Sequence, residues 1–167
     1  MGSEMCIRDS PRMTLDWLEL KVPPPVVALL LGFGAWWLAP LGPAIAWPEV
    51  LRQGLAGALL LAGVALDFSG LVAFVSRHTT VSPLSPRKSS ALVTTGIYRF
   101  TRNPMYLGLA ILLTAWAVWL AALLPLLGPV LFVLYISRFQ IRPEERVLTD
   151  LFGQAYTVYT QRVCRWL

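Results

Sequence analysis

Residues 104–137 of the chain read PMYLGLAILLTAWAVWLAALLPLLGPVLFVLYIS and contain no charged side chain. A helix rises about 1.5 Å per residue, so roughly 20 residues cross the hydrocarbon of a bilayer and this stretch is too long for one span. Pro125 and the pair Gly128-Pro129 interrupt it, and such residues favour a turn over a continuous helix. We therefore predict a tight hairpin of two transmembrane helices, with an outgoing arm over 106–124 and a return arm that starts near Pro129.

Two further apolar stretches precede this hairpin. Residues 22–48 carry no charge and contain a continuous apolar run over 26–38, and residues 51–75 are also long enough to span the membrane. The chain is 56% hydrophobic and 14% charged, against about 25% charged residues in soluble domains. We predict an all-α integral membrane protein with about four transmembrane helices. Asp67 lies inside the second span, where an acid is a functional candidate unless it reaches the interface or pairs with Arg77 or the tail.

The distribution of charge predicts the orientation of the bundle. Residues 76–103 hold basic side chains and no acid, whereas the connections on the other side hold only Glu49 and Arg52, or no charge. By the positive-inside rule the basic loop is cytoplasmic, and an even number of spans places both termini there too. The loop's basic residues are Arg77, Arg87, Lys88, Arg99 and Arg102.

The C-terminal residues 144–167 form a separate amphipathic pattern. Apolar side chains recur at spacings of three and four, which predicts a cytoplasmic amphipathic helix on the bundle or the membrane interface. A simple surface anchor is the alternative, because basic amphipathic helices commonly bind membranes. The apolar residues are Val147, Leu148, Leu151, Phe152, Ala155, Tyr156 and Tyr159.

Several classes of protein are disfavoured by the remaining residues. Cys6 and Cys164 lack the spacing of a disulfide framework or a zinc site, and His78 is the only histidine, so we predict no metal. The excess of 14 basic over 9 acidic residues is explained by orientation and has no nucleic-acid-reading motif. Residues 1–12 are interpreted as a polar leader that is not necessarily native, and residues 13–167 as one domain.

Two polar motifs border the predicted hairpin at its ends. LVTTGIY (92–98) runs into RNPMYLG (102–108), and RPEE (142–145) follows the return arm. Because a helical hairpin brings its entry and exit to one membrane face, Tyr106 and Glu144 are expected to lie close together and to form a pocket. A structural role is the alternative: Asn103 and Pro104 cap and start a helix.

These motifs, followed in order by Phe152-Gly153, Tyr156 and Tyr159, resemble the isoprenylcysteine carboxyl methyltransferases and related phospholipid methyltransferases of membranes. The resemblance covers residues 92–166. It implies S-adenosylmethionine as the cofactor, bound at the cytoplasmic face without a Rossmann fold. Asn103 stands where the family commonly has histidine. The cofactor contacts that the resemblance implies are Leu92, Val93, Tyr98, Asn103, Pro104, Met105, Tyr106, Glu144 and Glu145.

The implied site suits methyl transfer. A glutamate accepts hydrogen bonds from ribose hydroxyls or an ammonium group, and tyrosine rings offer flat faces to adenine or a sulfonium. Transfer to a carboxylate cancels charge and needs alignment in a dry pocket but no base, whereas an amine acceptor must lose a proton. For Glu144 and Glu145 the alternative is a solvated helix face that pairs with Arg142 or Arg146.

The acceptor is predicted to be amphipathic and associated with the membrane. In the family an arginine one turn before the first glutamate contacts the substrate, and here that position is Gln140. Arg142 or Arg138 can substitute, so Arg142 and Tyr106 are the predicted catalytic residues. We expect carboxyl O-methylation of an isoprenylcysteine-like, prenylated acceptor. The alternatives are N-methylation of a phospholipid or other lipid amine, or a non-catalytic membrane scaffold.

Overall fold

The computed structural model describes residues 19–75 and 92–167, so the predicted leader 1–12 and most of the basic loop, with Arg77 and His78, lie outside the described residues. The described residues form helices and no β-strand, in agreement with the all-α prediction. The main helices are α1 (Pro24–Leu38), α2 (Glu49–Val75), α3 (Pro104–Leu120), α4 (Leu127–Ile136) and α5 (Arg142–Arg162). Short 3-10 turns are η2 (Ala39–Leu41), η4 (Gly96–Arg99) and η5 (Leu124–Leu126), and a π-helical turn, η6, covers Ser137–Ile141.

Within residues 19–75 and 92–167, three helical segments are long and apolar enough to cross a membrane, namely Pro24–Leu41, Glu49–Ala73 and Leu124–Arg162. The two spans predicted over 26–38 and 51–75 coincide with α1 and α2. The helix α3 is apolar but shorter than these segments. The outgoing arm predicted over 106–124 ends early, at Leu120, because Ala121 takes a left-handed φ of 50°. The return arm begins at Leu127, and Pro129 is accommodated in its first turn.

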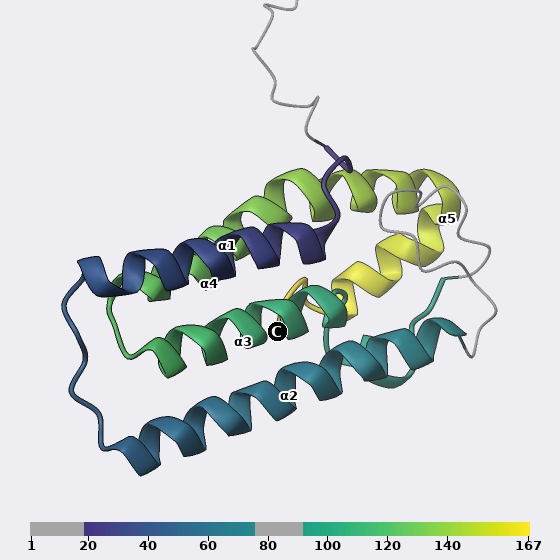
Figure 1. Ribbon diagram of the computed structural model, residues 1–167. Helices are drawn as coiled ribbons and strands as arrows, with labels where there is room; N and C mark the ends of the chain where they lie inside the picture. Colours follow the sequence, from purple (N-terminus) through teal and green to yellow (C-terminus); the bar gives the residue numbers. More distant parts are fainter. Residues whose placement is uncertain (1–18, 76–91) are drawn as a thin grey trace, which may run out of the picture.

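The helix α3 lies at the centre of the bundle. It packs along α2 on one side, and α1 packs against both α3 and α4 (Figure 1). The contact of α2 with α3 is close because Gly63 faces Gly108: a Cβ at Gly108 would lie 2.9 Å from the Gly63 carbonyl oxygen. Small residues of this kind let membrane helices approach each other. The exposed faces of α1 and α2 present large apolar side chains outward, such as Leu29 and Leu61.

The long final segment changes its helical geometry where α4 passes into α5. Pro143 has no N–H to donate to the carbonyl oxygen four residues earlier, that of Phe139. This oxygen instead accepts a hydrogen bond of 3.1 Å from the Leu20 backbone N–H. The discontinuity is the π-helical turn η6, and such turns are frequent at functional sites. The hydrogen bond from Leu20 to Phe139 connects the segment before α1 with this turn, directly before α5.

A second break, at Gly153, folds the end of α5 back toward α3, as the yellow part of the chain shows (Figure 1). Gly153 has φ 49° and ψ −122°, a conformation that is not helical. The single continuous apolar face predicted for the tail is therefore wrong: Tyr156 and Tyr159 are buried, whereas Leu151 is 44% exposed. The predicted helix over 144–167 also ends early, at Arg162.

The substitution Gly153→Ala is expected to destabilise the fold because residues with a Cβ rarely adopt a positive φ. The expected cost is about 1–3 kcal/mol in the free energy of unfolding. Gly54→Ala is the matched control, since Gly54 lies in α2 with nothing near its potential Cβ. Thermal unfolding of both variants in detergent provides the measurement. Equal midpoints would show that the bend at Gly153 does not require glycine.

Candidate active site

Tyr106 and Glu144 meet where α3 begins and α5 begins. The Tyr106 hydroxyl donates a hydrogen bond of 2.6 Å to Glu144 Oε1, and Gln140 Nε2 donates to the same oxygen at 3.0 Å. Gln140, in η6, is only 1% exposed. Among the described residues nothing donates to the second carboxylate oxygen, Oε2. Tyr106 and Gln140 thus fix the Glu144 carboxylate through one oxygen.

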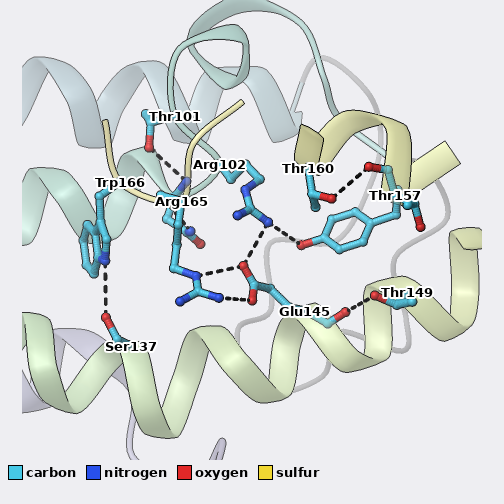
Figure 2. Close-up of polar contacts among 11 residues, drawn as sticks. Thr101, Arg102, Ser137, Glu145, Thr149, Thr157, Thr160, Arg165 and Trp166 are labelled. Atoms are coloured by element: carbon cyan, nitrogen blue, oxygen red, sulfur yellow. Dashed lines mark hydrogen bonds and ion pairs between the residues drawn. The ribbon is translucent and has the colours of Figure 1, made fainter. Parts of the chain in front are cut away.

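Glu145 lies in a different network, drawn in Figure 2. Arg165 donates to both of its carboxylate oxygens, from Nε at 3.0 Å and from Nη2 at 2.6 Å. Arg102 Nη1 lies 2.9 Å from Glu145 Oε1 and 3.5 Å from the Tyr156 hydroxyl oxygen. The hydrogen bond to Glu145 is the main cause that raises the Arg165 pKa above its usual value. Glu145 therefore links the start of α3, the start of α5 and the C-terminal segment.

The C-terminal segment covers the start of α3. Asn103 Nδ2 donates to the Arg165 carbonyl oxygen at 2.9 Å, and the Arg102 N–H donates to the Cys164 carbonyl oxygen at 3.1 Å. The Asn103 side chain consequently makes no capping hydrogen bond to α3, contrary to the structural alternative, although Pro104 does occupy the first helical position. Trp166 fastens the segment to η6 through a bond of 3.2 Å from Nε1 to Ser137 Oγ.

The motif 92–98 packs against the second half of α5. Val93 and Tyr98 are buried, and Leu92 contacts a buried cluster that contains Tyr156 and Tyr159. The Tyr159 hydroxyl donates to the Tyr98 carbonyl oxygen at 2.8 Å. Burial raises the Tyr98 pKa above its usual value, and the nearby Tyr159 and Glu144 raise it further. The predicted site residues 92–98, 103–106 and 144–145 therefore lie on neighbouring segments.

Arg142 is not brought to this site. It is exposed, and two residues in a helix correspond to about 200° of rotation, which turns it away from Glu144. It shares its face with Arg138 and Arg146, which both pair with Glu19. Sequence reasoning missed Glu19 because no periodicity or motif connects it with a helix more than a hundred residues later.

Two other residues were handled only in part by sequence reasoning. Sequence reasoning did not assign a partner to Arg165. The signal that could have found its role is the pair of acids Glu144-Glu145 in an arginine-rich tail. Asp67 packs against Gly108, and its buried Oδ1 has no hydrogen-bond partner among the residues described. The proposed partner Arg77 lies outside the described residues. In the described part of the chain no group of three or more potential metal ligands is present.

The arrangement is that of a helical membrane protein with a cluster of hydrogen-bonded polar side chains where α3 and α5 begin. The model of the phospholipid methyltransferase family matches residues 51–155. The chain therefore belongs to the phospholipid methyltransferase family, a family of membrane methyltransferases.

Two curated proteins are similar to the chain. One, an uncharacterized protein of Haemophilus influenzae, is 48% identical over 63 residues, which cover 38% of this chain and all of that protein. The other, the protein-S-isoprenylcysteine O-methyltransferase of Schizosaccharomyces pombe, is 31% identical over 119 residues, or 69% of this chain. The match covers 48% of that protein, so the chain spans about half of its length.

Proposed function

We propose that the protein transfers a methyl group from S-adenosylmethionine to an amphipathic acceptor in the membrane, by carboxyl O-methylation of an isoprenylcysteine-like substrate. The observation that carries the proposal is the convergence of Tyr106 and Gln140 on one oxygen of the Glu144 carboxylate. The matching family is named for the methylation of phospholipids, and the similar Schizosaccharomyces pombe protein is named for the O-methylation of isoprenylcysteine.

Glu144 is the proposed polar contact of the cofactor. Its oriented carboxylate suits the hydroxyls of a ribose or an ammonium group, each a donor that a carboxylate accepts. The backbone of Asn103, Pro104 and Met105 and the side chain of Tyr98 are proposed to line the same pocket, with Leu92 and Val93 behind them. Since both Glu145 oxygens already accept from arginines, we propose that Glu145 holds the pocket wall and does so through Arg102 and Arg165.

The cofactor supplies an electrophilic methyl group on a positively charged sulfur. With the cofactor bound, attack by an acceptor carboxylate would form a carbon–oxygen bond and break the sulfur–methyl bond. This would cancel the two charges and require no proton transfer. Tyr106 and Gln140 contribute by holding Glu144 in one position before the acceptor arrives. A lipid amine acceptor needs a group that takes its proton, whereas a carboxylate acceptor needs none.

The test of the function uses the purified protein in detergent with methyl-labelled S-adenosylmethionine. Prenyl-cysteine analogues and total membrane lipid are offered as separate acceptors. Base-labile label in the prenyl-cysteine analogue is the expected result, because methyl esters hydrolyse in base. If the label is found only in a lipid amine, the reaction is N-methylation and the proposal of O-methylation fails. If the protein shows no saturable binding of the cofactor, a non-catalytic scaffold would be favoured.

We also propose that α3 is the fourth span and that the pocket faces the cytoplasm, as the acid-free basic loop predicts. The test replaces both native cysteines with serine and introduces one cysteine at a time. Phe100 and Leu41 are suitable because both are exposed. Phe100 lies shortly before the start of α3, whereas Leu41 lies three residues before Ala44, which pairs with Ala122 just beyond the other end of α3. A membrane-impermeant thiol reagent applied to intact cells is expected to label Leu41→Cys only. Labelling of Phe100→Cys alone would show that the protein has the opposite orientation in the membrane.

The role of Arg142 toward the acceptor stays a prediction. Because Arg142 points away from Glu144, Arg142→Ala is expected to leave cofactor affinity unchanged and to raise the acceptor's apparent KM several-fold. Arg142→Lys should restore only part of the loss, since lysine lacks the bidentate fork of arginine. Steady-state kinetics with a prenyl-cysteine acceptor and cofactor titration together measure the effect. An unchanged KM would indicate that Arg142 only helps to orient the protein in the membrane.

A further inference from the structure

Residues 163–167, which follow α5 and are here called the strap, cross the region where α3 and α5 begin. Val163 is buried in the cluster that Leu92 contacts. Three residues later, Trp166 packs against the buried core cluster that Tyr106 also contacts. The strap therefore runs from the Leu92 side of the candidate active site to the Tyr106 side.

Two side chains of the strap fasten one of its edges (Figure 2). Arg165 donates from Nε and Nη2 to both carboxylate oxygens of Glu145, near the start of α5. Trp166 Nε1 donates to Ser137 Oγ, which lies in η6 at a distance of 3.2 Å. The strap is thus held against the same final segment, η6 and α5, that supplies Glu144.

The other edge of the strap is held by the residues directly before α3. The Arg102 backbone N–H donates to the Cys164 carbonyl oxygen at 3.1 Å, and Asn103 Nδ2 donates to the Arg165 carbonyl oxygen at 2.9 Å. The first of these two bonds joins backbone groups, so of the two only the second depends on the identity of a side chain. The amide of Asn103 is therefore directed to the strap.

The strap is exposed on its outer side and covers buried residues on its inner side. Cys164 is exposed, and Leu167 is 84% exposed. Next to the strap's partners before α3, Thr101 is 1% exposed and Pro104 is buried. Displacement of residues 164–167 would break the hydrogen bonds described above and unpack the ring of Trp166, whereas the helices would keep their contacts with one another.

We propose that the strap closes the cofactor pocket and that Asn103 is the positioning residue whose amide latches it. The proposal rests on the proposed binding of S-adenosylmethionine between Glu144 and the backbone of 103–105. Entry and release of the cofactor require the strap to open, and its closure excludes water from the pocket. Neither the strap nor the Asn103 amide binds the cofactor.

A latch and a cofactor contact differ in their effects on binding rates. A weaker latch leaves the strap open for a larger fraction of the time, so association and dissociation of the cofactor both become faster. The Kd, which is the ratio of the two rate constants, stays the same, because a ligand with equal affinity for two states does not shift the balance between them. Loss of a cofactor contact would instead speed dissociation and raise the Kd.

The test measures both rates with labelled S-adenosylmethionine, by rapid filtration and by a chase with unlabelled cofactor, on the purified protein in detergent. Asn103→Ala is expected to raise both rates about two- to tenfold, the usual effect of one hydrogen bond, with an unchanged Kd. Asn103→Asp should raise them further, because a carboxylate would face the Arg165 carbonyl oxygen. Asn103→His should restore the parental rates, since its ring N–H can donate.

Two further variants separate the latch from a general loss of stability. Ser137→Ala removes a different anchor of the strap and is expected to raise both rates in equal proportion. Gln53→Ala is the matched control, because it removes an exposed amide that donates one hydrogen bond of 2.9 Å within α2, and it should change neither rate.

Three results would contradict the proposal. A raised Kd in Asn103→Ala with unchanged association would make the amide a cofactor contact. Parental rates in both Asn103→Ala and Ser137→Ala would show that the strap does not limit exchange of the cofactor. Failure of the parent protein to bind S-adenosylmethionine would refute the proposed function itself, and the role of the strap with it.

Discussion

Replacing Glu144 with glutamine is expected to weaken S-adenosylmethionine binding about ten- to a hundredfold, because a charge-assisted hydrogen bond typically contributes about 1.5–3 kcal/mol. The variant should remain folded, since an amide oxygen still accepts from Tyr106 and Gln140 at the positions where Oε1 accepts now. Calorimetric titration of the purified protein with the cofactor measures the affinity, and the Tm without cofactor measures the fold.

Glu49→Gln provides the control for the loss of one carboxylate. Glu49 is exposed in the first turn of α2, where its carboxylate accepts a hydrogen bond of 2.9 Å from Gln53 Nε2 in the same helix. This variant is expected to bind the cofactor as tightly as the parent protein. An unchanged affinity in Glu144→Gln would return Glu144 to a structural role, in which it only joins α3 to the start of α5.

Replacing Gly108 with alanine is expected to destabilise the bundle, because α2 packs closely against α3 at this position. The added Cβ would lie 2.6 Å from Asp67 Cγ and 2.9 Å from the Gly63 carbonyl oxygen, closer than real Cβ contacts. One of these neighbours is backbone, so α2 and α3 must separate. Overpacking of this kind typically costs about 1–3 kcal/mol. Because Tyr106 lies two residues away in α3, cofactor affinity should fall as well.

Gly57→Ala in α2 is the matched control, because nothing lies within 4 Å of a Cβ at that position. Alanine there is expected to stabilise the helix slightly, by about 0.5–1 kcal/mol. The Gly108→Ala change should also cost less in an Asp67→Ala background, where one of the two clashes is gone. Thermal unfolding in detergent compares the parent protein with Gly108→Ala, Gly57→Ala, Asp67→Ala and the variant that carries both Asp67→Ala and Gly108→Ala. Equal midpoints for Gly108→Ala and Gly57→Ala would show that the two helices are not in tight contact.

The sequence by itself determined the features that depend on local composition. A charge-free run longer than one span, interrupted by Pro125 and Gly128-Pro129, required helices with a break between them, because proline and glycine disrupt helical hydrogen bonding. The same run brought its two polar ends toward one another, so Tyr106 and Glu144 could be expected to meet. The order of the motifs in 92–166 identified the family that the match over residues 51–155 shows.

The tertiary structure alone decided which charged residues face the site. Arg142 and Glu144 are two positions apart, but helical rotation places them on different faces, and Glu145 is occupied by Arg102 and Arg165. These pairings join residues that are distant along the chain, so no local pattern predicts them. The break at Gly153 was equally hidden, because glycine is also tolerated in a helix and only packing of Tyr156 and Tyr159 against 92–98 selects the bend.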